Sequence, residues 1–203
     1  MKRNRLIFLL AFCSGFSIMA IELLGGRMLA PYFGGSIYVW GSIITVFMLS
    51  LSLGYLMGGR WSLSRPNLRR YSVLFLAGGV MMLPLLLWSE HWMDAISLRI
   101  EDPRYGSLAA SLALFFLPTT IMGMISPYSV RLLVREQEHS GQVAGLLYFV
   151  STLGSALGTL ATSFYLVLYF EMNTILASIM VIMCLSGFAA FLGHRSERSH
   201  VFA

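Results

Sequence analysis

Apolar positions along the chain fall into six long runs, separated by short stretches rich in charged, glycine and proline residues. Each run approaches or exceeds the roughly 20 residues of helix that cross a ~30 Å hydrocarbon core. The runs therefore predict an all-α integral membrane protein with one domain, residues 1–203, built from six transmembrane helices. The predicted spans are residues 6–24, 39–58, 71–88, 108–125, 143–170 and 174–192.

The amino-acid composition also indicates a membrane protein. Of the 203 residues, 57% are hydrophobic and only 11% are charged, which excludes an ordinary soluble domain. Because the net charge of +5 belongs to a membrane protein, no nucleic-acid partner is expected. Cys13 and Cys184 fall inside apolar runs, so we expect neither a disulfide nor a metal or cofactor site. The basic N-terminus and first apolar run resemble a secretory signal, but the run continues to Leu24, and we interpret it as a retained first helix.

Basic residues are distributed very unevenly between the loops on the two sides of the predicted membrane. With the N-terminus in the cytoplasm, only Arg27, Arg99 and Arg104 of the 14 lysines and arginines lie outside. Cytoplasmic loops of membrane proteins carry such an excess of Lys and Arg. We therefore expect a multi-pass protein of the bacterial inner (cytoplasmic) membrane with both termini cytoplasmic.

Two charged residues, Glu22 and Arg27, lie at or inside the expected membrane boundary. A charge in hydrocarbon costs at least ~2.5 kcal/mol, so such residues are functional-site candidates. Five residues of ideal helix set them about 140° apart, so they do not pair along one face. Gly25 and Gly26 between them are expected to end or unwind the helix and let Arg27 fold back. Either the two charges tie the first helix to a neighbour, or they face a cavity and bind a polar or cationic ligand.

Aromatic residues follow these two charges. Pro31 to Ser36 forms a predicted turn cluster, and Trp40 opens the second span. Such aromatics are commonly membrane-interface belt residues, but their faces can also hold an ammonium group by cation–π attraction worth ~0.5 to 2 kcal/mol. A tyrosine in the fifth span supplies a further candidate hydroxyl. The predicted ligand-binding residues are Glu22, Arg27, Tyr32, Trp40 and Tyr148.

Small residues and prolines indicate contacts and breaks between helices. Glycines four apart let helices approach closely, and prolines such as Pro84 kink or break a span where neighbours satisfy the freed carbonyls. Hydroxyl residues at steps of four over 151–163 give the fifth span a face that fits a neighbouring helix or a substrate. Apolar residues at every fourth position over 92–100 predict a short helix on the membrane surface. The residues assigned to helix packing or gating are Gly54, Gly58, Arg60, Pro118, Pro127, Gly154 and Gly158.

The first loop and its flanking helices resemble a known family. The segment from Glu22 to Ser36, ELLGGRMLAPYFGGS, is similar to the membrane domain of spermidine-synthase-like integral membrane proteins, which fuse a major-facilitator-like domain to a spermidine synthase. The stretch from Gly141 to Gly158 looks like that family's later helical motif. The resemblance implies a bundle like one half of a major facilitator, whose halves are related by an axis along the membrane normal. A homodimer could supply both halves.

The sequence carries no glycine-rich loop or strand-helix alternation of a spermidine synthase. The resemblance therefore implies that synthase-like or methyltransferase-like chemistry sits on a separate cytosolic protein. We expect a subunit that binds or transports a polyamine-like or adenosyl-bearing metabolite with such a partner. The alternatives are a structural membrane anchor for a partner enzyme and a self-sufficient half-size transporter working as a homodimer. Catalysis by this chain alone is not expected, because its histidines lie at loops and helix ends.

Overall fold

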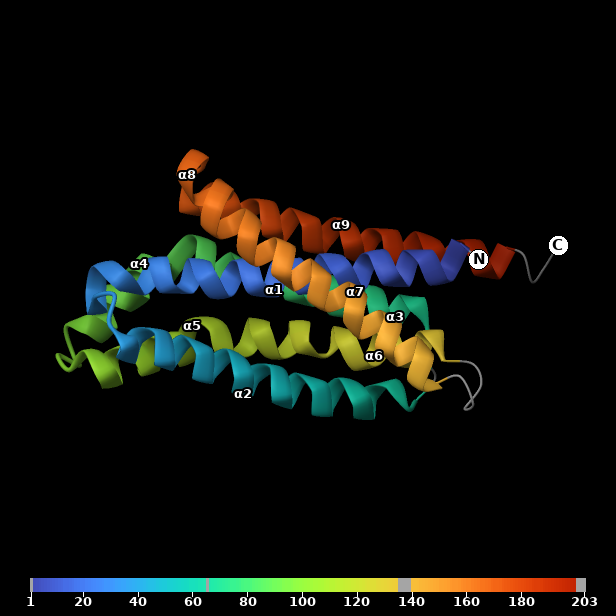
Figure 1. The fold of residues 1–203 in the computed structure, drawn as a ribbon, viewed down its shortest axis with the longest axis horizontal. Helices are drawn as coiled ribbons and strands as arrows, with labels where there is room; N and C mark the ends of the chain where they lie inside the picture. The colour runs from blue at the N-terminus through green and yellow to red at the C-terminus, as the bar shows by residue number, and fades with distance from the viewer. Residues whose placement is uncertain (1, 65, 135–139, 200–203) are drawn as a thin grey trace.

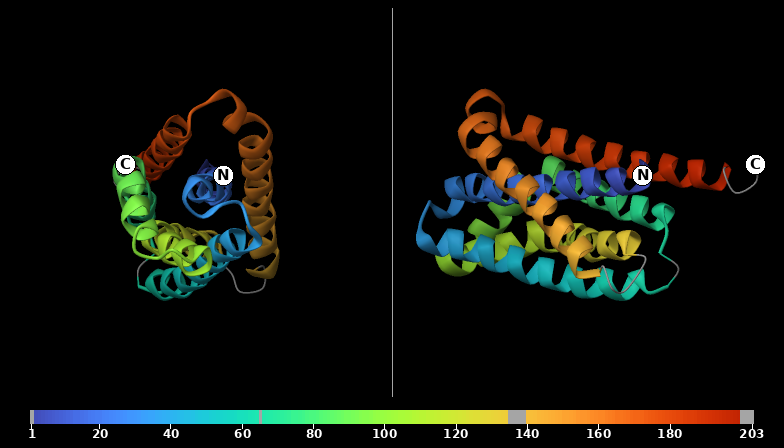
Figure 2. Two further views of the ribbon diagram at one scale, coloured as in Figure 1. Left: turned by 90° about the vertical axis from the view of Figure 1, so that its left-hand side faces the viewer. Right: turned by 45° about the vertical axis from the view of Figure 1, so that its right-hand side comes forward.

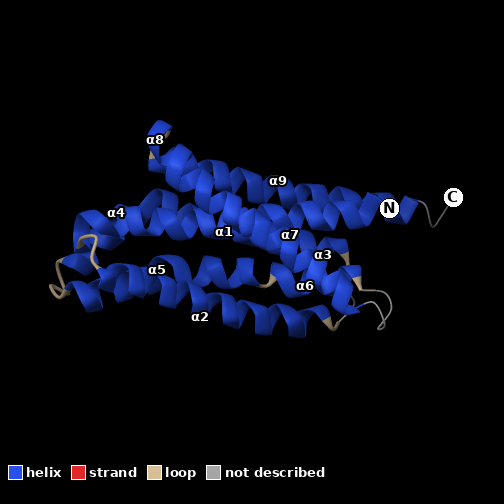
Figure 3. Ribbon diagram, viewed as in Figure 1, coloured by secondary structure: helices blue, strands red, loops and turns tan. Residues whose placement is uncertain are grey.

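The structure, a computed structural model, describes residues 2–64, 66–134 and 140–199. Every regular element in this part of the chain is helical, and the helices form one elongated bundle (Figures 1 and 3). Six helical segments are long and apolar enough to cross a membrane, so the predicted six-span architecture is confirmed. The elements are α1 (Lys2–Phe33), α2 (Ile37–Ser62), α3 (Leu68–Val80), α4 (Leu83–Ser97), α5 (Pro103–Gly123), α6 (Ile125–Leu133), α7 (Ser140–Ala161), the π-helix η1 (Thr162–Leu166), α8 (Val167–Tyr169) and α9 (Met172–Ser199).

Helix α1 is longer than its apolar run and passes through Gly25 and Gly26 without a break. The prediction that these glycines unwind the helix is therefore wrong. A break there would leave backbone N–H and C=O groups unsatisfied in hydrocarbon, which is costly. Instead the glycines make room for aromatic rings, because a Cβ at Gly25 would meet the Phe115 ring and one at Gly26 the Trp40 ring. The turn itself begins only at Gly34, whose φ of 81° favours glycine.

Three spans consist of consecutive helices. The third is α3 followed by α4, with the break just before Pro84, as predicted. The fourth is α5 followed by α6, interrupted at Met124, whereas Pro118 lies inside α5 and does not end it. The fifth passes from α7 through η1 to α8. The prediction of a separate surface helix over residues 92–100 is wrong. After Pro84 in its first turn, α4 contains no glycine or proline, and it continues to Ser97.

Both termini lie at one end of the bundle, with the connection from α2 to α3 (Figure 1). We call this the terminal end; the distal end carries the connections from α1 to α2, α4 to α5 and α8 to α9. Viewed along the bundle, α1 occupies its middle, and the other spans surround it (Figure 2). Accordingly, α1 contacts α2, α4, α5, α6, α7 and α9.

The pairing of the spans has an internal symmetry. The most extensive contacts are those of α1 with α7, α2 with α5, and α3 with α9. If spans one, two and three are exchanged for spans four, five and six, the pair of α1 with α7 becomes the pair of α5 with α2. The pair of α3 with α9 is unchanged by the same exchange. Span one begins at the terminal end and span four at the distal end (Figure 1), so the two halves run in opposite directions. Inverted three-helix repeats of this kind occur within each half of a major facilitator.

Glycine contacts repeat between the two symmetric pairs. A Cβ at Gly54 would collide with the carbonyl oxygen of Thr120, and one at Gly58 with Met124. In the pair of α1 with α7, a Cβ at Gly154 would collide with the carbonyl oxygen of Phe12, and one at Gly158 with that of Phe16. Close backbone approach through small residues is how membrane helices associate without a hydrophobic driving force.

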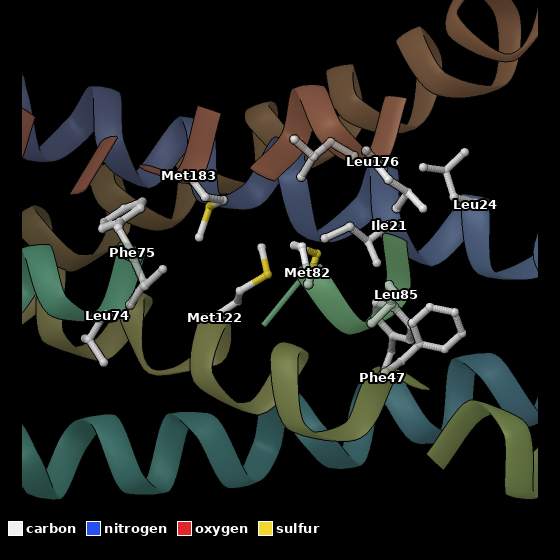
Figure 4. Packing of buried hydrophobic residues seen from close by; sticks show 14 of the residues in the cluster. Ile21, Leu24, Phe47, Leu74, Phe75, Met82, Leu85, Met122, Leu176 and Met183 are labelled. Carbon is white, nitrogen blue, oxygen red and sulfur yellow. The ribbon is translucent and has the colours of Figure 1, made fainter. Parts of the chain in front are cut away.

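The core gathers buried hydrophobic residues from α1, α2, α3, α4, α5, α6 and α9, with Leu147 from α7. Figure 4 shows Met82, Met122 and Met183 in its middle, and all three are buried. A Cβ at Gly78 would lie 3.0 Å from Met183 Cε and 3.1 Å from Met122 Cγ, so the missing side chain provides the space for these thioethers. Flexible methionines fill irregular gaps of this kind well.

Candidate functional site

A cavity of about 500 Å³ lies between α1, α2, the α5–α6 junction and α7. The break at Met124 places both ends of that junction, Gly123 and Ile125, in its wall. Many of the other lining residues carry hydroxyl groups: Ser14, Tyr55, Ser126, Tyr148, Ser151, Thr152 and Ser155. A cavity with this many hydroxyl groups can hydrogen-bond a polar ligand at a depth where lipid cannot.

The cavity opens between α2 and α7. Tyr55 on α2 and Tyr148 on α7 stand at this opening, with 48% and 54% of their surfaces exposed, and their phenol groups are close enough to interact electrostatically. The span containing α7 is the least buried of the six. Tyr148, one of the predicted ligand-binding residues, lines this cavity. Tyr55 lines it as well and is not among the predicted residues.

Glu22 continues the face of α1 that lines the cavity. Ala11, Gly15 and Ile18 form part of the wall, and Glu22 follows Ile18 by four residues, which is one further turn of the same face. Its side chain is half-buried, and among the described residues it has no hydrogen-bond or ion-pair partner. An unpaired carboxylate at this depth is expensive, so Glu22 is the strongest candidate for contact with a cation.

Arg27 does not pair with Glu22. Its Nη1 donates a hydrogen bond to the carbonyl oxygen of Val167 at 2.9 Å, in the short helix α8 that ends the fifth span. Carbonyls at a helix C-terminus lack helical donors and attract cations. Arg27 therefore joins the end of the fifth span to α1. This matches the expectation that the charge ties the first helix to a neighbour.

Tyr32 and Trp40 lie at the distal end, away from the cavity wall. The Tyr32 hydroxyl faces the carboxylates of Glu90 and Asp94 on α4, and the Trp40 ring lies against Gly26 of α1. The five predicted binding residues thus separate into three groups. Tyr148 lines the cavity, Glu22 lies one turn beyond it, and the other three stabilise contacts at the distal end.

The residues predicted for packing or gating are also dispersed. Gly54, Gly58, Gly154 and Gly158 lie in close helix contacts, and Pro118 is buried inside α5. Pro127 is in the first turns of α6 and lines the cavity. Arg60 is exposed in the last turn of α2, at the terminal end.

Two helix irregularities lie at the site, and only one has a local sequence signal. The break at Met124 follows Gly123 and precedes Pro127, which has no backbone N–H to donate to the Gly123 carbonyl four residues earlier. The π-helix η1 contains neither glycine nor proline, and its buried Thr162 Oγ1 has no hydrogen-bond partner in the described part of the chain. Because η1 contacts α1, this segment lies beside the part of α1 that leads to Glu22. Such π-helical turns are frequent at functional sites.

Within the described ranges, no group of three or more histidine, cysteine, aspartate or glutamate residues could hold a metal ion. Comparison with known proteins returned no matching family model, no matching curated protein and no matching solved structure. The resemblance to spermidine-synthase-like membrane proteins therefore stays a prediction. The chain is a multi-pass membrane protein, and its function has to be argued from the cavity and its surroundings.

Proposed function

We propose that this protein binds a small organic cation in the cavity between α1, α2, α5–α6 and α7, and moves it across the membrane. The observation that carries this proposal is the hydroxyl-lined cavity of about 500 Å³ with the unpaired Glu22 one helical turn beyond it. Its volume is within the ~300 to 1,000 Å³ typical of small-molecule sites. Glu22 supplies the counter-charge, and the hydroxyl groups accept hydrogen bonds from the ligand's ammonium groups.

The ligand class that fits this chemistry is a polyamine-like or adenosyl-bearing metabolite. Alkylammonium groups alternate with short apolar stretches in a polyamine, which suits a wall in which Ile18 and Leu51 lie between hydroxyl residues. The exposed rings of Tyr55 and Tyr148 offer cation–π faces at the entrance. At the distal end, Glu90 and Asp94 on α4 add negative charge beside Tyr32.

A second subunit is proposed to complete the site. The cavity opens between α2 and α7, and exposed apolar side chains such as Met48, Leu153 and Leu157 flank it on those helices. A second copy with the same orientation could cover this opening and enclose the ligand. The same proposal places both termini in the cytoplasm of a bacterial cell, with the protein in the inner membrane, because the basic residues concentrate at the terminal end.

The family resemblance suggests a further partner, a cytosolic spermidine-synthase-like or methyltransferase-like protein. Such a protein would produce or consume the metabolite, and this chain would hold or transfer it at the membrane. The rival function is a structural anchor for that enzyme. An anchor needs no ligand, so it predicts that the cavity and Glu22 can change without loss beyond stability.

Thermal unfolding of the purified protein in detergent tests the proposal. Spermidine, putrescine, S-adenosylmethionine and its decarboxylated and thioether relatives are added separately at rising concentration. A bound ligand raises the unfolding temperature according to mass action. We expect a shift with one of these cations, its loss in Glu22→Gln, and its retention in Glu171→Gln, which removes an exposed carboxylate at the distal end.

Flux measurements separate transport from binding alone. Liposomes containing only this chain are loaded with the ligand identified by thermal shift. Efflux from them, absent with Glu22→Gln, supports a self-sufficient transporter. Binding without efflux supports a subunit that requires its partner, and the absence of both binding and efflux with well-folded variants supports the anchor.

A further inference from the structure

We propose that the groove between α2, α3 and the end of α5 holds an anionic phospholipid of the surrounding bilayer, with an acyl chain in the groove and its phosphate at Arg60. The groove has a volume of about 630 Å³. It is separate from the cavity described above, which lies on the other side of α2. Its residues at the polar end are Arg60, Trp61 and Ser64, and its apolar part includes Val73, Ala77 and Ile121.

The apolar part of the groove suits a hydrocarbon chain. Met57 on α2, Val73 and Ala77 on α3, and Ile121 on α5 line it, and none of them carries a polar side-chain hydrogen-bonding group apart from the weak thioether acceptor. Met57 and Val73 are each about half exposed, at 50% and 49%, so the groove is open on the membrane side. A small residue, Ala77, leaves space between larger neighbours. A flexible acyl chain can fill such a groove without leaving polar groups unpaired.

The polar end of the groove carries basic groups in fixed positions. Arg60 is exposed in the last turn of α2, and its guanidinium has no hydrogen-bond or ion-pair partner among the described residues. Arg70 is held nearby, because it donates a hydrogen bond to Ser64 Oγ at 3.1 Å and another to the Ser64 carbonyl oxygen. Its guanidinium carbon lies 5.9 Å from the centre of the Trp61 ring.

No acidic residue opposes this charge from the segments that build the groove. The sequence contains no aspartate or glutamate between Leu23 and Ser89 or between Pro103 and Val134. Basic pockets between transmembrane helices at the membrane surface attract anionic lipid head groups. Trp61, whose ring packs 5.9 Å from that of Tyr128, is the type of residue that lies at head-group depth.

A lipid fits this groove better than a second copy of the chain does. A twofold contact would bring Arg60 of one copy towards Arg60 of the other, with no carboxylate from these segments to neutralise the pair. A phospholipid instead supplies the missing negative charge and the apolar chain together. The proposal concerns the leaflet at the terminal end, whichever side of the membrane that is.

Fluorescence quenching of Trp61 by brominated lipids tests this proposal. A variant in which Trp40, Trp88 and Trp92 are replaced by Phe keeps Trp61 as the only tryptophan. It is reconstituted in phosphatidylcholine vesicles containing a small fraction of lipid brominated on its acyl chains, either phosphatidylglycerol or phosphatidylcholine. We expect brominated phosphatidylglycerol to quench Trp61 more strongly at equal fraction.

Two changes in the groove and one matched control make the experiment specific. Arg60→Gln is expected to weaken the apparent affinity for phosphatidylglycerol about fivefold, the factor for one basic residue near an anionic surface. Ala77→Phe fills the apolar part and is expected to abolish the excess quenching. Arg99→Gln removes an exposed arginine at the distal end and should change nothing.

Equal quenching by the two brominated lipids, or an unchanged excess in both Arg60→Gln and Ala77→Phe, overturns the proposal. If the triple tryptophan variant does not fold, native mass spectrometry of the otherwise unchanged chain gives the same comparison. Retained phosphatidylglycerol is then expected in the unchanged chain and in Arg99→Gln, and its loss in Arg60→Gln. Retention in all three proteins contradicts a site at Arg60.

Discussion

The guanidinium of Arg27 donates to the backbone carbonyl of Val167 at 2.9 Å, across 140 residues of sequence. The bond joins the distal part of α1, the central helix of the bundle, to the end of the fifth span. At the terminal end, Arg3 on the same helix donates to the carbonyl oxygen of Leu132 at 2.8 Å, at the end of α6. Helix α1 is thus joined near both of its ends to the C-terminal ends of neighbouring helices, whose free carbonyls favour a cation.

Removing the distal bond should destabilise the protein modestly and leave ligand binding in place. We expect Arg27→Gln to lower the free energy of unfolding by about 1 kcal/mol, which is below the ~1.5 to 3 kcal/mol of a hydrogen bond to a charged group because Arg27 is exposed. Thermal and denaturant unfolding in detergent measure this loss. Arg99→Gln is the control. A variant of normal stability that no longer binds the ligand would instead place Arg27 in the binding site.

A methyl group at Gly154 should disrupt the contact between α1 and α7. Its Cβ would collide with the carbonyl oxygen of Phe12 and lie 3.1 Å from the Phe12 Cα, and backbone cannot yield as a flexible side chain can. We expect Gly154→Ala to lower the free energy of unfolding by about 2 kcal/mol, a typical cost of overpacking.

Gly145 provides the matched control on the same helix. A Cβ there would meet no other atom within 4 Å, so Gly145→Ala should stabilise the helix by up to ~1 kcal/mol. Opposite signs for the two substitutions would establish the close contact, and equal effects would refute it. By the internal symmetry of the bundle, Gly54→Ala and Gly59→Ala should behave as a second pair of this kind.

Water should reach the cavity between α2 and α7 but not the lipid-facing side of α9. In a background with Cys13 and Cys184 replaced by Ala, we expect Thr152→Cys to react with a membrane-impermeant maleimide in proteoliposomes. Leu185→Cys, on an exposed apolar position of α9, should not react. Protection of Thr152→Cys by the ligand identified in thermal unfolding would place that ligand in the cavity. Equal inertness of both cysteines would mean that lipid or a protein partner excludes water from it.

Asp102 should give the connection between α4 and α5 a pH-dependent stability. Its side chain accepts hydrogen bonds from Arg104, including the backbone N–H at 2.9 Å that caps α5, and these interactions lower the pKa of the carboxyl. Because the pKa of Asp102 is lower in the folded state, its stabilising effect is fully present above the pKa of the unfolded chain, ~3.9. The effect is lost as the pH falls through the pKa of the folded state.

We therefore expect Asp102→Asn to lower the unfolding temperature slightly at neutral pH, with a difference from the unchanged protein that disappears in strong acid. Unfolding curves recorded across the acidic range measure this difference. Glu101→Gln, which removes the neighbouring exposed carboxylate, serves as the control. A difference for Asp102→Asn that persists undiminished in acid would show that helix capping by the carboxylate is not its source.

Part of the candidate site could be anticipated from sequence. The charge of Glu22 within an apolar run marks it as a candidate, and the hydroxyl residues at steps of four in the fifth span predict a face for either a neighbouring helix or a substrate. Tyr55 and Ser14 were missed, because one tyrosine or serine in a span is common and has no signal of its own. Arg27 was recognised as unusual, but its partner is a backbone carbonyl, and any residue can supply one.

By itself, the sequence determined the class of protein and its six spans, because partition into hydrocarbon depends on the summed hydropathy of about 20 consecutive residues and not on their partners. The tertiary structure decided which polar groups meet. Tyr55 and Tyr148 share a cavity entrance, Arg27 reaches Val167, and Gly154 contacts Phe12, only because of how the helices rotate and pair. Those rotations are set by close packing between spans far apart in the chain, which the local periodicity of any one span does not specify.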